Sequence, residues 1–233
     1  MGGIRIPSMK ITDIDMGKCY FNPGCALMIY KPEYSQKILD LLNKYFGPVQ
    51  LHSICCRHEP KLPSGATVIN NCAGCDRRFR SLYDGIQTIS LWEILSGIDS
   101  LPLPNHHGLT VSVHDPCSFR PKPQVHEAVR SLLRKMNIKI IEAKCSGTRS
   151  ICCGDNFYPH LPIEKVTELQ KKRASQMPCQ DVVVYCVSCV KSMAIGGKTP
   201  YYLVDLIFNE ATEPGETRID VYHEALTQYI DMH

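Results

Sequence analysis

The segment Asp181-Val182-Val183-Val184-Tyr185-Cys186-Val187-Ser188-Cys189 places a run of β-branched and aromatic residues directly before a C-x-x-C motif. A short apolar run of this composition predicts a buried strand over 181–185. The first half of the chain carries a similar arrangement, in which a predicted strand over 66–70 precedes Cys72-Ala73-Gly74-Cys75. A strand that leads into a pair of cysteines therefore occurs twice, and this repetition determines both the fold and the functional class that we expect.

Ten of the thirteen cysteines belong to two sets of five. Each set contains a lone cysteine, an adjacent pair and a C-x-x-C motif. The first set is Cys25, Cys55, Cys56, Cys72 and Cys75, and the second set is Cys117, Cys152, Cys153, Cys186 and Cys189. Adjacent cysteines suit a single metal ion poorly, because their Cα atoms lie ~3.8 Å apart and their side chains point to opposite sides of an extended backbone. A cluster with several irons accepts thiolates from different directions, so the pattern indicates two polynuclear iron–sulfur sites.

Other interpretations of the cysteines are weaker. Structural disulfides suit short secreted domains, whereas this chain has 233 residues and its first seven show no apolar leader. The two C-x-x-C motifs resemble half-sites of a four-cysteine zinc centre, but 110 residues separate them and zinc leaves both adjacent pairs unexplained. Zinc in one half stays open as an alternative. The compact C-x2-C-x2-C-x3-C run of cubane ferredoxins does not occur, and we interpret Cys19, Cys145 and Cys179 as small buried hydrophobes.

Charge and hydropathy exclude two classes of partner. The formal net charge of +3 is too balanced for a nucleic-acid or anionic-membrane surface. No apolar run approaches the ~18 residues that span a bilayer. So many free thiols predict a reducing, cytoplasmic location. The basic stretches 76–80 and 171–173 are interpreted as solvated helix faces, with a docking surface for an acidic redox partner as the alternative.

Alternating strand and helix patterns predict an α/β fold with mainly parallel strands, in two pseudo-symmetric Rossmann-like halves. We place the first half at 1–99, a linker containing His106 and His107 at 100–108, and the second half at 109–233. The expected strands are 18–21, 49–54, 66–70, 86–90, 110–114, 138–142 and 181–185, and the expected helices are 32–46, 75–83, 91–97, 123–136 and 163–177. Residues 89–95 also match 202–208, which indicates an internal duplication. The cysteines fall where strands end, the edge at which open α/β sheets bind ligands.

With both sets laid out, the chain resembles the CCG-domain (cysteine-rich domain) family of iron–sulfur proteins, which includes a subunit of heterodisulfide reductase. The resemblance covers about residues 19–209. It implies two non-cubane 4Fe–4S clusters, one on each set, with a disulfide cleaved between them. The second set fits the family motif closely, with 34 residues between Cys117 and Cys152 and 32 between Cys153 and Cys186.

The first set departs from that motif. It has 29 residues between Cys25 and Cys55, Arg57 in place of the motif's glycine, and only 15 residues between Cys56 and Cys72. The missing length corresponds to the helix expected at 163–177. We therefore expect the first site to be the more exposed of the two.

The leading functional hypothesis is a two-cluster oxidoreductase that reduces a disulfide or oxidises thiols, served by an electron-donating flavoprotein or ferredoxin-like subunit. Arg57 is a candidate for holding a substrate carboxylate, with an ordinary surface arginine as the alternative. No acid–base residue is singled out as catalytic, and no nucleotide-binding motif is present. An electron-transfer subunit without its own substrate, and a zinc-binding scaffold or regulatory protein, are the alternative functions.

Overall fold

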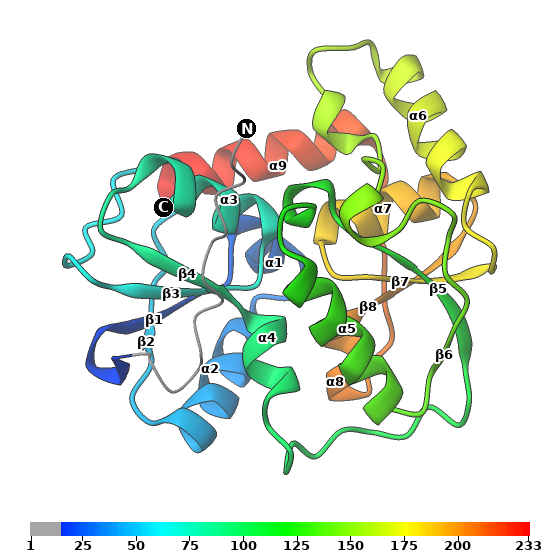
Figure 1. Cartoon of the computed structure of the whole chain (residues 1–233). Helices are drawn as coiled ribbons and strands as arrows, with labels where there is room; N and C mark the ends of the chain where they lie inside the picture. The colour runs from blue at the N-terminus through cyan, green and yellow to red at the C-terminus, as the bar shows by residue number, and fades with distance from the viewer. Residues whose placement is uncertain (1–14) are drawn as a thin grey trace, which may run out of the picture.

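The computed structural model describes residues 15–233 and contains two four-stranded parallel sheets that lie side by side (Figure 1). The first sheet has the order β2-β1-β3-β4, with β1 (Cys19–Asn22), β2 (Gln50–Leu51), β3 (Thr67–Asn70) and β4 (Gln87–Ser90). The second has the order β6-β5-β7-β8, with β5 (Thr110–His114), β6 (Lys139–Ile140), β7 (Asp181–Val184) and β8 (Thr199–Tyr202). The same order in both sheets confirms the predicted α/β class and its two similar halves.

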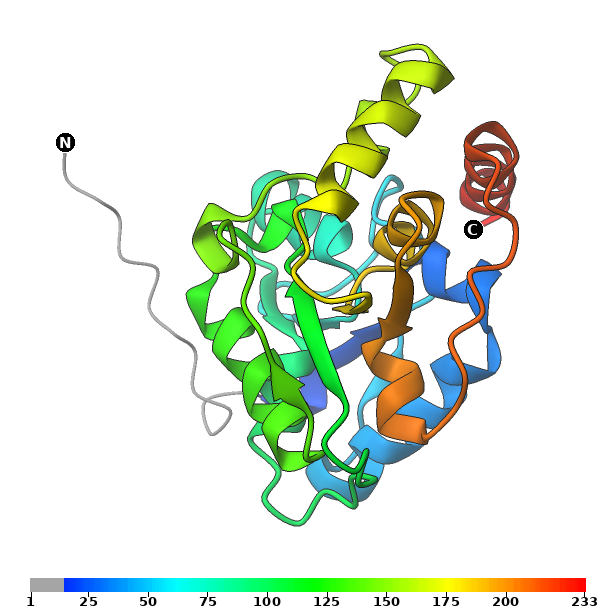
Figure 2. The ribbon, with the colours of Figure 1, turned by 90° about the vertical axis from the view of Figure 1, so that its right-hand side faces the viewer.

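Helices connect these strands in the same sequence in each half. The first half contains α1 (Cys25–Tyr30), α2 (Glu33–Phe46), α3 (Ala73–Leu82) and α4 (Leu91–Ser96). The second contains α5 (Pro123–Lys135), α6 (Ile163–Ser175), α7 (Val187–Ile195), α8 (Leu203–Phe208) and α9 (Ile219–Met232). Helix α6 has no counterpart in the first half, and it projects at the same end of the molecule as α9 (Figure 2).

The helices expected at 32–46, 91–97, 123–136 and 163–177 are present with small shifts at their ends, whereas the strands expected at 49–54 and 138–142 are reduced to two residues each. Both short strands are edge strands that pair only with the strand beside them. Beyond β2, Nδ2 of Asn22 donates to the carbonyl oxygens of His52 (3.2 Å) and Ile54 (3.4 Å), so a side chain replaces the strand ladder there. Helices α1, α7 and α9 were not expected.

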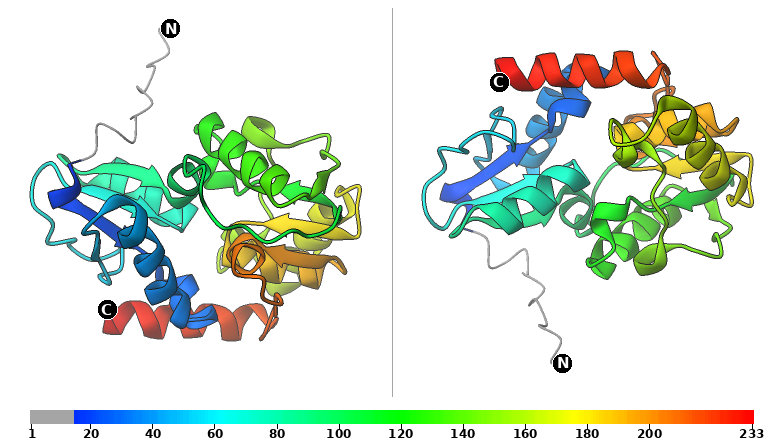
Figure 3. Two further views of the ribbon diagram at one scale, coloured as in Figure 1. Left: turned by 90° about the horizontal axis from the view of Figure 1, so that it is seen from below. Right: turned by 90° about the horizontal axis from the view of Figure 1, so that it is seen from above.

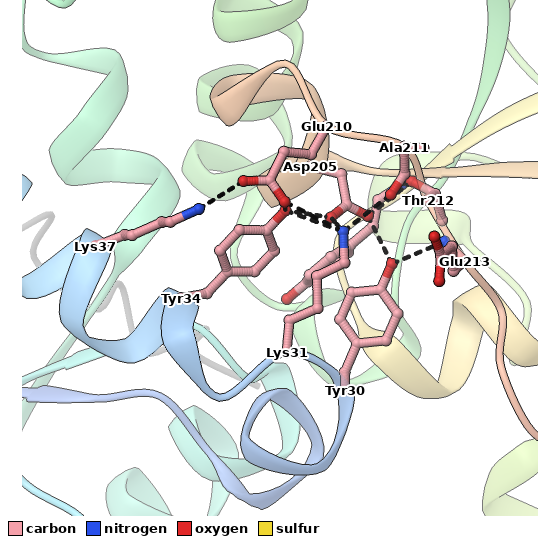
Figure 4. A network of polar contacts seen from close by, with 10 residues as sticks. Tyr30, Lys31, Tyr34, Lys37, Asp205, Glu210, Ala211, Thr212 and Glu213 are labelled. Carbon is pink, nitrogen blue, oxygen red and sulfur yellow. Dashed lines mark hydrogen bonds and ion pairs between the residues drawn. The ribbon is translucent and has the colours of Figure 1, made fainter.

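The two halves share one hydrophobic core, and the intervening residues 100–108 contain no helix or strand. Trp92 of α4 contacts Tyr185 edge to face, with ring centroids 6.1 Å apart. On the opposite side of the core, Asp205 of α8 accepts hydrogen bonds from Tyr30 (2.7 Å) and from Lys31 (2.8 Å), as Figure 4 shows. Polar and apolar contacts therefore fix one half against the other.

Helix α9 belongs to the second half in sequence but crosses to the first half. Both views in Figure 3 show it running from the second sheet to the neighbourhood of α1. Its last turn bonds to the first half, because His58 Nε2 lies 2.7 Å from the carbonyl oxygen of Ile230 and Cys55 N–H donates to the carbonyl oxygen of His233. Within residues 15–233, no helix has both the length and the apolar character needed to cross a bilayer.

Candidate iron–sulfur sites

All ten cysteines of the two sets lie in loops or first helical turns that follow strands. In the first half, β1 leads to Cys25 at the start of α1, and β3 leads to Cys72, the N-cap of α3. In the second half, β5 leads to Cys117 and β7 leads to Cys186, the N-cap of α7. Because parallel strands direct their carboxyl ends to one edge of a sheet, each fold half gathers its own set at one edge.

Within the first set the thiols contact one another in a continuous order. Neighbouring thiols shift one another's pKa in the pairs Cys25 and Cys55, Cys55 and Cys56, Cys56 and Cys75, and Cys75 and Cys72, so these side chains lie close together. The structure thus brings together five residues that are spread over more than fifty positions of sequence.

The second set shows the same contacts in the same order. The pairs whose thiols shift one another's pKa are Cys117 and Cys152, Cys152 and Cys153, Cys153 and Cys189, and Cys189 and Cys186. Two loops of different length therefore place equivalent sulfur atoms in equivalent relative positions. The spacing of the cysteines along the chain does not by itself require the two sets to be arranged alike.

The electrostatics of each set fit a polynuclear metal group. Hydrogen bonds from neighbouring thiols lower the pKa of Cys55 and of Cys152, the first member of each adjacent pair. Hydrogen bonds to Cys55 and to Cys152, together with burial and repulsion from neighbouring thiolates, raise the pKa of Cys25 and of Cys117 respectively. Five clustered thiols cannot all ionise against their mutual repulsion unless a cationic group lies among them, so the donor sets suit a cluster that binds as many thiolates.

Backbone amides approach the sulfur atoms at both sites. N–H groups of Cys75 and Gly74 bond to Cys72, and the Gly154 N–H donates to Cys152 Sγ at 3.4 Å. These donors lie at or near helix N-termini, where the aligned peptide dipoles favour an anion. Amide hydrogen bonds of this kind stabilise thiolate-bound, negatively charged clusters.

The structure explains why Arg57 replaces the glycine found beside the second adjacent pair. Gly154 has φ +108°, and a Cβ atom there would lie 2.8 Å from Gln170 Cγ and 3.0 Å from Gln170 N, both in α6. The first half has no equivalent of α6, and the side chain of Arg57 is exposed. Arg57 thus lies at the surface of the protein, and a role in holding a substrate carboxylate stays a prediction.

The expectation that the first site is the more open one is wrong for these side chains. Cys55, Cys56 and Cys75 are buried in the first set, against Cys153 and Cys189 in the second. The cover comes from α9, whose Ile230 packs in one apolar cluster with the buried cysteines of the first set and with Phe79. Sequence reasoning missed this helix because it lies far from the first set in the chain.

Helix α9 also contacts the second site at its other end. Tyr222 OH and Ser188 Oγ, inside the second C-x-x-C motif, lie 3.0 Å apart. His223 Nε2 lies 3.1 Å from Asp155 Oδ1, just after the second adjacent pair. One helix therefore contacts the surroundings of both cysteine sets.

Two side chains outside the cysteine sets contribute to the second site. One ligand atom each of His114, Cys153 and Cys189 lie within 4.8 Å of one another, and all three residues are buried. Arg173 of α6 is also buried, so the interpretation of 171–173 as a solvated face holds for Lys171 and Lys172 but is wrong for Arg173. In the sequence, Arg173 falls on the same helical face as Val166, Gln170 and Ala174, and this spacing could have predicted its burial. His106, by contrast, bonds to the Leu206 carbonyl oxygen at 3.0 Å.

Comparison with known proteins supports the iron–sulfur class. No protein-family model matches the chain. Part of the chain is similar to a protein described as a probable membrane-anchored ferredoxin from Chromohalobacter salexigens, with 30% identity over 95 residues. The match covers 38% of this chain and only 14% of that protein. Together with the clustered cysteines, this similarity indicates an iron–sulfur protein.

Proposed function

We propose that this chain is an electron-transfer iron–sulfur protein of the CCG type, with one 4Fe–4S cluster of non-cubane type on each set of five cysteines. The observation that carries the proposal is the matching order of thiol contacts, Cys25–Cys55–Cys56–Cys75–Cys72 and Cys117–Cys152–Cys153–Cys189–Cys186. When bound, such clusters take up and release single electrons at potentials that their surroundings set. The protein's own groups hold the thiolates, supply amide donors and exclude water. A flavoprotein or ferredoxin-like subunit in a reducing cytoplasm is the proposed electron donor.

Metal analysis of matched cysteine variants tests this proposal. Protein purified without oxygen should contain iron and sulfide for two clusters, and it should give electron paramagnetic resonance signals on oxidation or reduction. Cys153→Ser and Cys56→Ser should each remove about one cluster's iron and a different signal. Cys179→Ser, outside both sets, should remove neither. A protein that holds zinc, and that loses zinc in Cys153→Ser, would establish the zinc alternative instead.

A second candidate function, reduction of a disulfide or oxidation of thiols, draws support from a cavity that residues of both halves form and whose lining contains no cysteine. The cavity has a volume of about 250 Å³ and is lined by residues of α1, α7 and α9, including Ile29, Val187 and Tyr222. Helix α1 begins at Cys25, and α7 begins directly after Cys186. Reduction of one disulfide there would take two electrons from the electron-donating subunit and two protons from water, break the S–S bond and release two thiols.

A thiol-release assay separates the two functions. Reduced protein freed of excess reductant is mixed without oxygen with bis(2-hydroxyethyl) disulfide, and the thiols released are compared with the electrons lost. Ala225→Trp would fill the cavity and should stop thiol release while iron content is unchanged, whereas Glu224→Trp on the exposed face of α9 should not. Protein that exchanges electrons with a flavoprotein but releases no thiols is a pure electron-transfer subunit.

A further inference from the structure

Arg173 is a buried guanidinium without a carboxylate partner in the described part of the chain. Its side chain is 1% exposed, and no Asp or Glu oxygen of residues 15–233 lies within 4.0 Å of it. Its nitrogen atoms donate instead to neutral acceptors, namely His114 Nδ1 (3.2 Å), Gln176 Oε1 (3.0 Å) and the Cys145 carbonyl oxygen (2.9 Å). A buried charge that no opposite charge balances is strongly unfavourable, so this site requires an anion.

The anion that Arg173 requires is available at the second set. Burial lowers the pKa of Arg173, and the ionised forms of Cys145 and Asp115, followed by those of Cys189 and Cys153, oppose that effect. The nearby carboxylate of Asp115 already accepts two hydrogen bonds from Arg130, at 2.6 and 2.9 Å. A thiolate-bound cluster with net negative charge would balance the guanidinium where no free carboxylate does.

The bond from Arg173 also fixes the tautomer of His114. A guanidinium N–H always donates, so Nδ1 of His114 must offer its lone pair and the ring proton must reside on Nε2. That Nε2 atom is buried and has no hydrogen-bond partner among the described residues. One ring nitrogen of His114 lies within 4.8 Å of the sulfur atoms of Cys153 and Cys189. A protonated nitrogen cannot coordinate metal, so, with the proton on Nε2, His114 would act as a donor toward the second set rather than as a ligand.

The first half lacks equivalents of both His114 and Arg173. Asn22 occupies the position equivalent to His114, three residues before the lone cysteine, and its Nδ2 atom is already committed to His52 and to the Ile54 carbonyl oxygen. Helix α6, which carries Arg173, has no counterpart there. The group that follows the first C-x-x-C motif is instead the carboxylate of Asp76, which is buried and paired with Lys122 at 2.8 Å.

We infer that His114 and Arg173 form a cationic, hydrogen-bond-donating wall for the cluster on the second set, and that this wall holds its reduction potential above that of the first cluster. The inference rests on the proposed function, since it requires a cluster at each set. Donors and positive charge stabilise the reduced, more negative form of a cluster and so raise its potential. Electrons that enter at the first site would then pass to the second.

Potentiometric titration monitored by electron paramagnetic resonance tests the inference. The signals are first assigned by their loss in Cys56→Ser and in Cys153→Ser. Arg173→Gln should shift only the second-site signal, to lower potential, and Lys172→Gln, an equal charge change on the exposed face of α6, should shift neither. His114→Leu should lower the same potential, and His114→Gln, which retains a donor, should restore part of it. His126→Leu removes another buried histidine with an unpartnered Nε2 among the described residues and should change neither potential.

Spectroscopy of the protein without substitutions tests the same inference even if a variant does not fold. With 15N-labelled histidine, electron–nuclear double resonance should show an exchangeable proton near the second-site signal and no strongly coupled nitrogen. Strong nitrogen coupling, equal potentials of the two clusters, or an unchanged second potential in Arg173→Gln with its iron intact would overturn the inference alone. Protein without iron, or with zinc on His114, Cys153 and Cys189, would overturn the proposed function as well.

Discussion

Lys31 Nζ lies 2.8 Å from Oδ1 of Asp205, and this ion pair joins the residue that ends α1 in the first half to the first turn of α8 in the second. An approximate counterpart runs the other way, since Lys122 of the second half pairs with Asp76 of the first at 2.8 Å. Each lysine follows the lone cysteine of its own half by a few residues. Each half therefore supplies a lysine that pairs with an aspartate of the other half, and each pair fixes a segment that carries a candidate ligand.

Loss of the Lys31–Asp205 pair should destabilise the whole protein. The Asp205 side chain is fully buried and also accepts hydrogen bonds from Tyr34 (2.5 Å) and Thr212 (2.8 Å). Removing one member of a buried pair leaves the other charge uncompensated, so Lys31→Met should lower the free energy of unfolding by about 3–5 kcal/mol. Lys37→Met, at a half-exposed lysine that pairs with Glu210, should cost no more than about 1 kcal/mol. Urea unfolding of the two variants gives the comparison, and equal losses would contradict it.

A charge placed in α9 should expose the first cluster selectively. Ile230 is 6% exposed and packs with Cys55, Cys56 and Cys75, whereas Met232 is 73% exposed. Ile230→Asp should admit water and oxygen to the first site, because a carboxylate cannot stay buried in that apolar cluster. Iron loss during timed air exposure should then begin with the first-site signal, and Met232→Asp should behave like the unmodified protein. Simultaneous loss of both signals in Ile230→Asp would show that α9 does not shield the first site specifically.

Substitution of Gly154 should cost more than substitution of a glycine with similar backbone strain but free space. Gly197 has φ +79° and no atom within 4 Å of an added Cβ, so Gly197→Ala should cost about 1–2 kcal/mol through its left-handed backbone alone. Gly154→Ala adds the clash with Gln170 and should cost about 1–3 kcal/mol more. Thermal unfolding measures both, and the iron content of Gly154→Ala should also fall at the second site. Equal destabilisation of the two variants would mean that α6 shifts to accommodate the added Cβ without loss of stability.

Acid should weaken the loop before the second set. Burial alone would raise the pKa of Asp115, but hydrogen bonds from Arg130, Tyr185 and the Gly147 N–H lower it below its ordinary value of 3.8. A carboxyl group whose pKa is lowered by folding contributes stability above its unfolded pKa and loses it as the pH falls through the folded value. Asp115→Asn should therefore be less stable than the unmodified protein at neutral pH, by about 3–5 kcal/mol. The difference in the free energy of unfolding should begin to shrink as the pH falls below about 4 and should vanish only below the folded pKa of Asp115. A difference that stays constant at all pH values would show that ionisation of Asp115 is not its cause.

The sequence predicted the strands and helices that are determined by local spacing of apolar residues. The strand before each C-x-x-C motif and the helices at 32–46 and 123–136 follow from local apolar spacing, which side-chain burial confirms. Residues 49–54 have equally apolar spacing, but a tertiary contact from Asn22 ends the strand early. The cover of the first site escaped prediction because it depends on contacts such as His58 with Ile230, which no local pattern records. Arg173 escaped because its positive neighbours suggested a solvated surface.

The position of α9 has a consequence for the order in which the protein matures. The first set is complete once residue 75 has been synthesised, but the helix that shields it spans Ile219–Met232. During translation the first site therefore stays unshielded while the ribosome makes the entire second half. A cluster inserted during that interval would meet no barrier from α9, which would close over the first site only after the second half has been made.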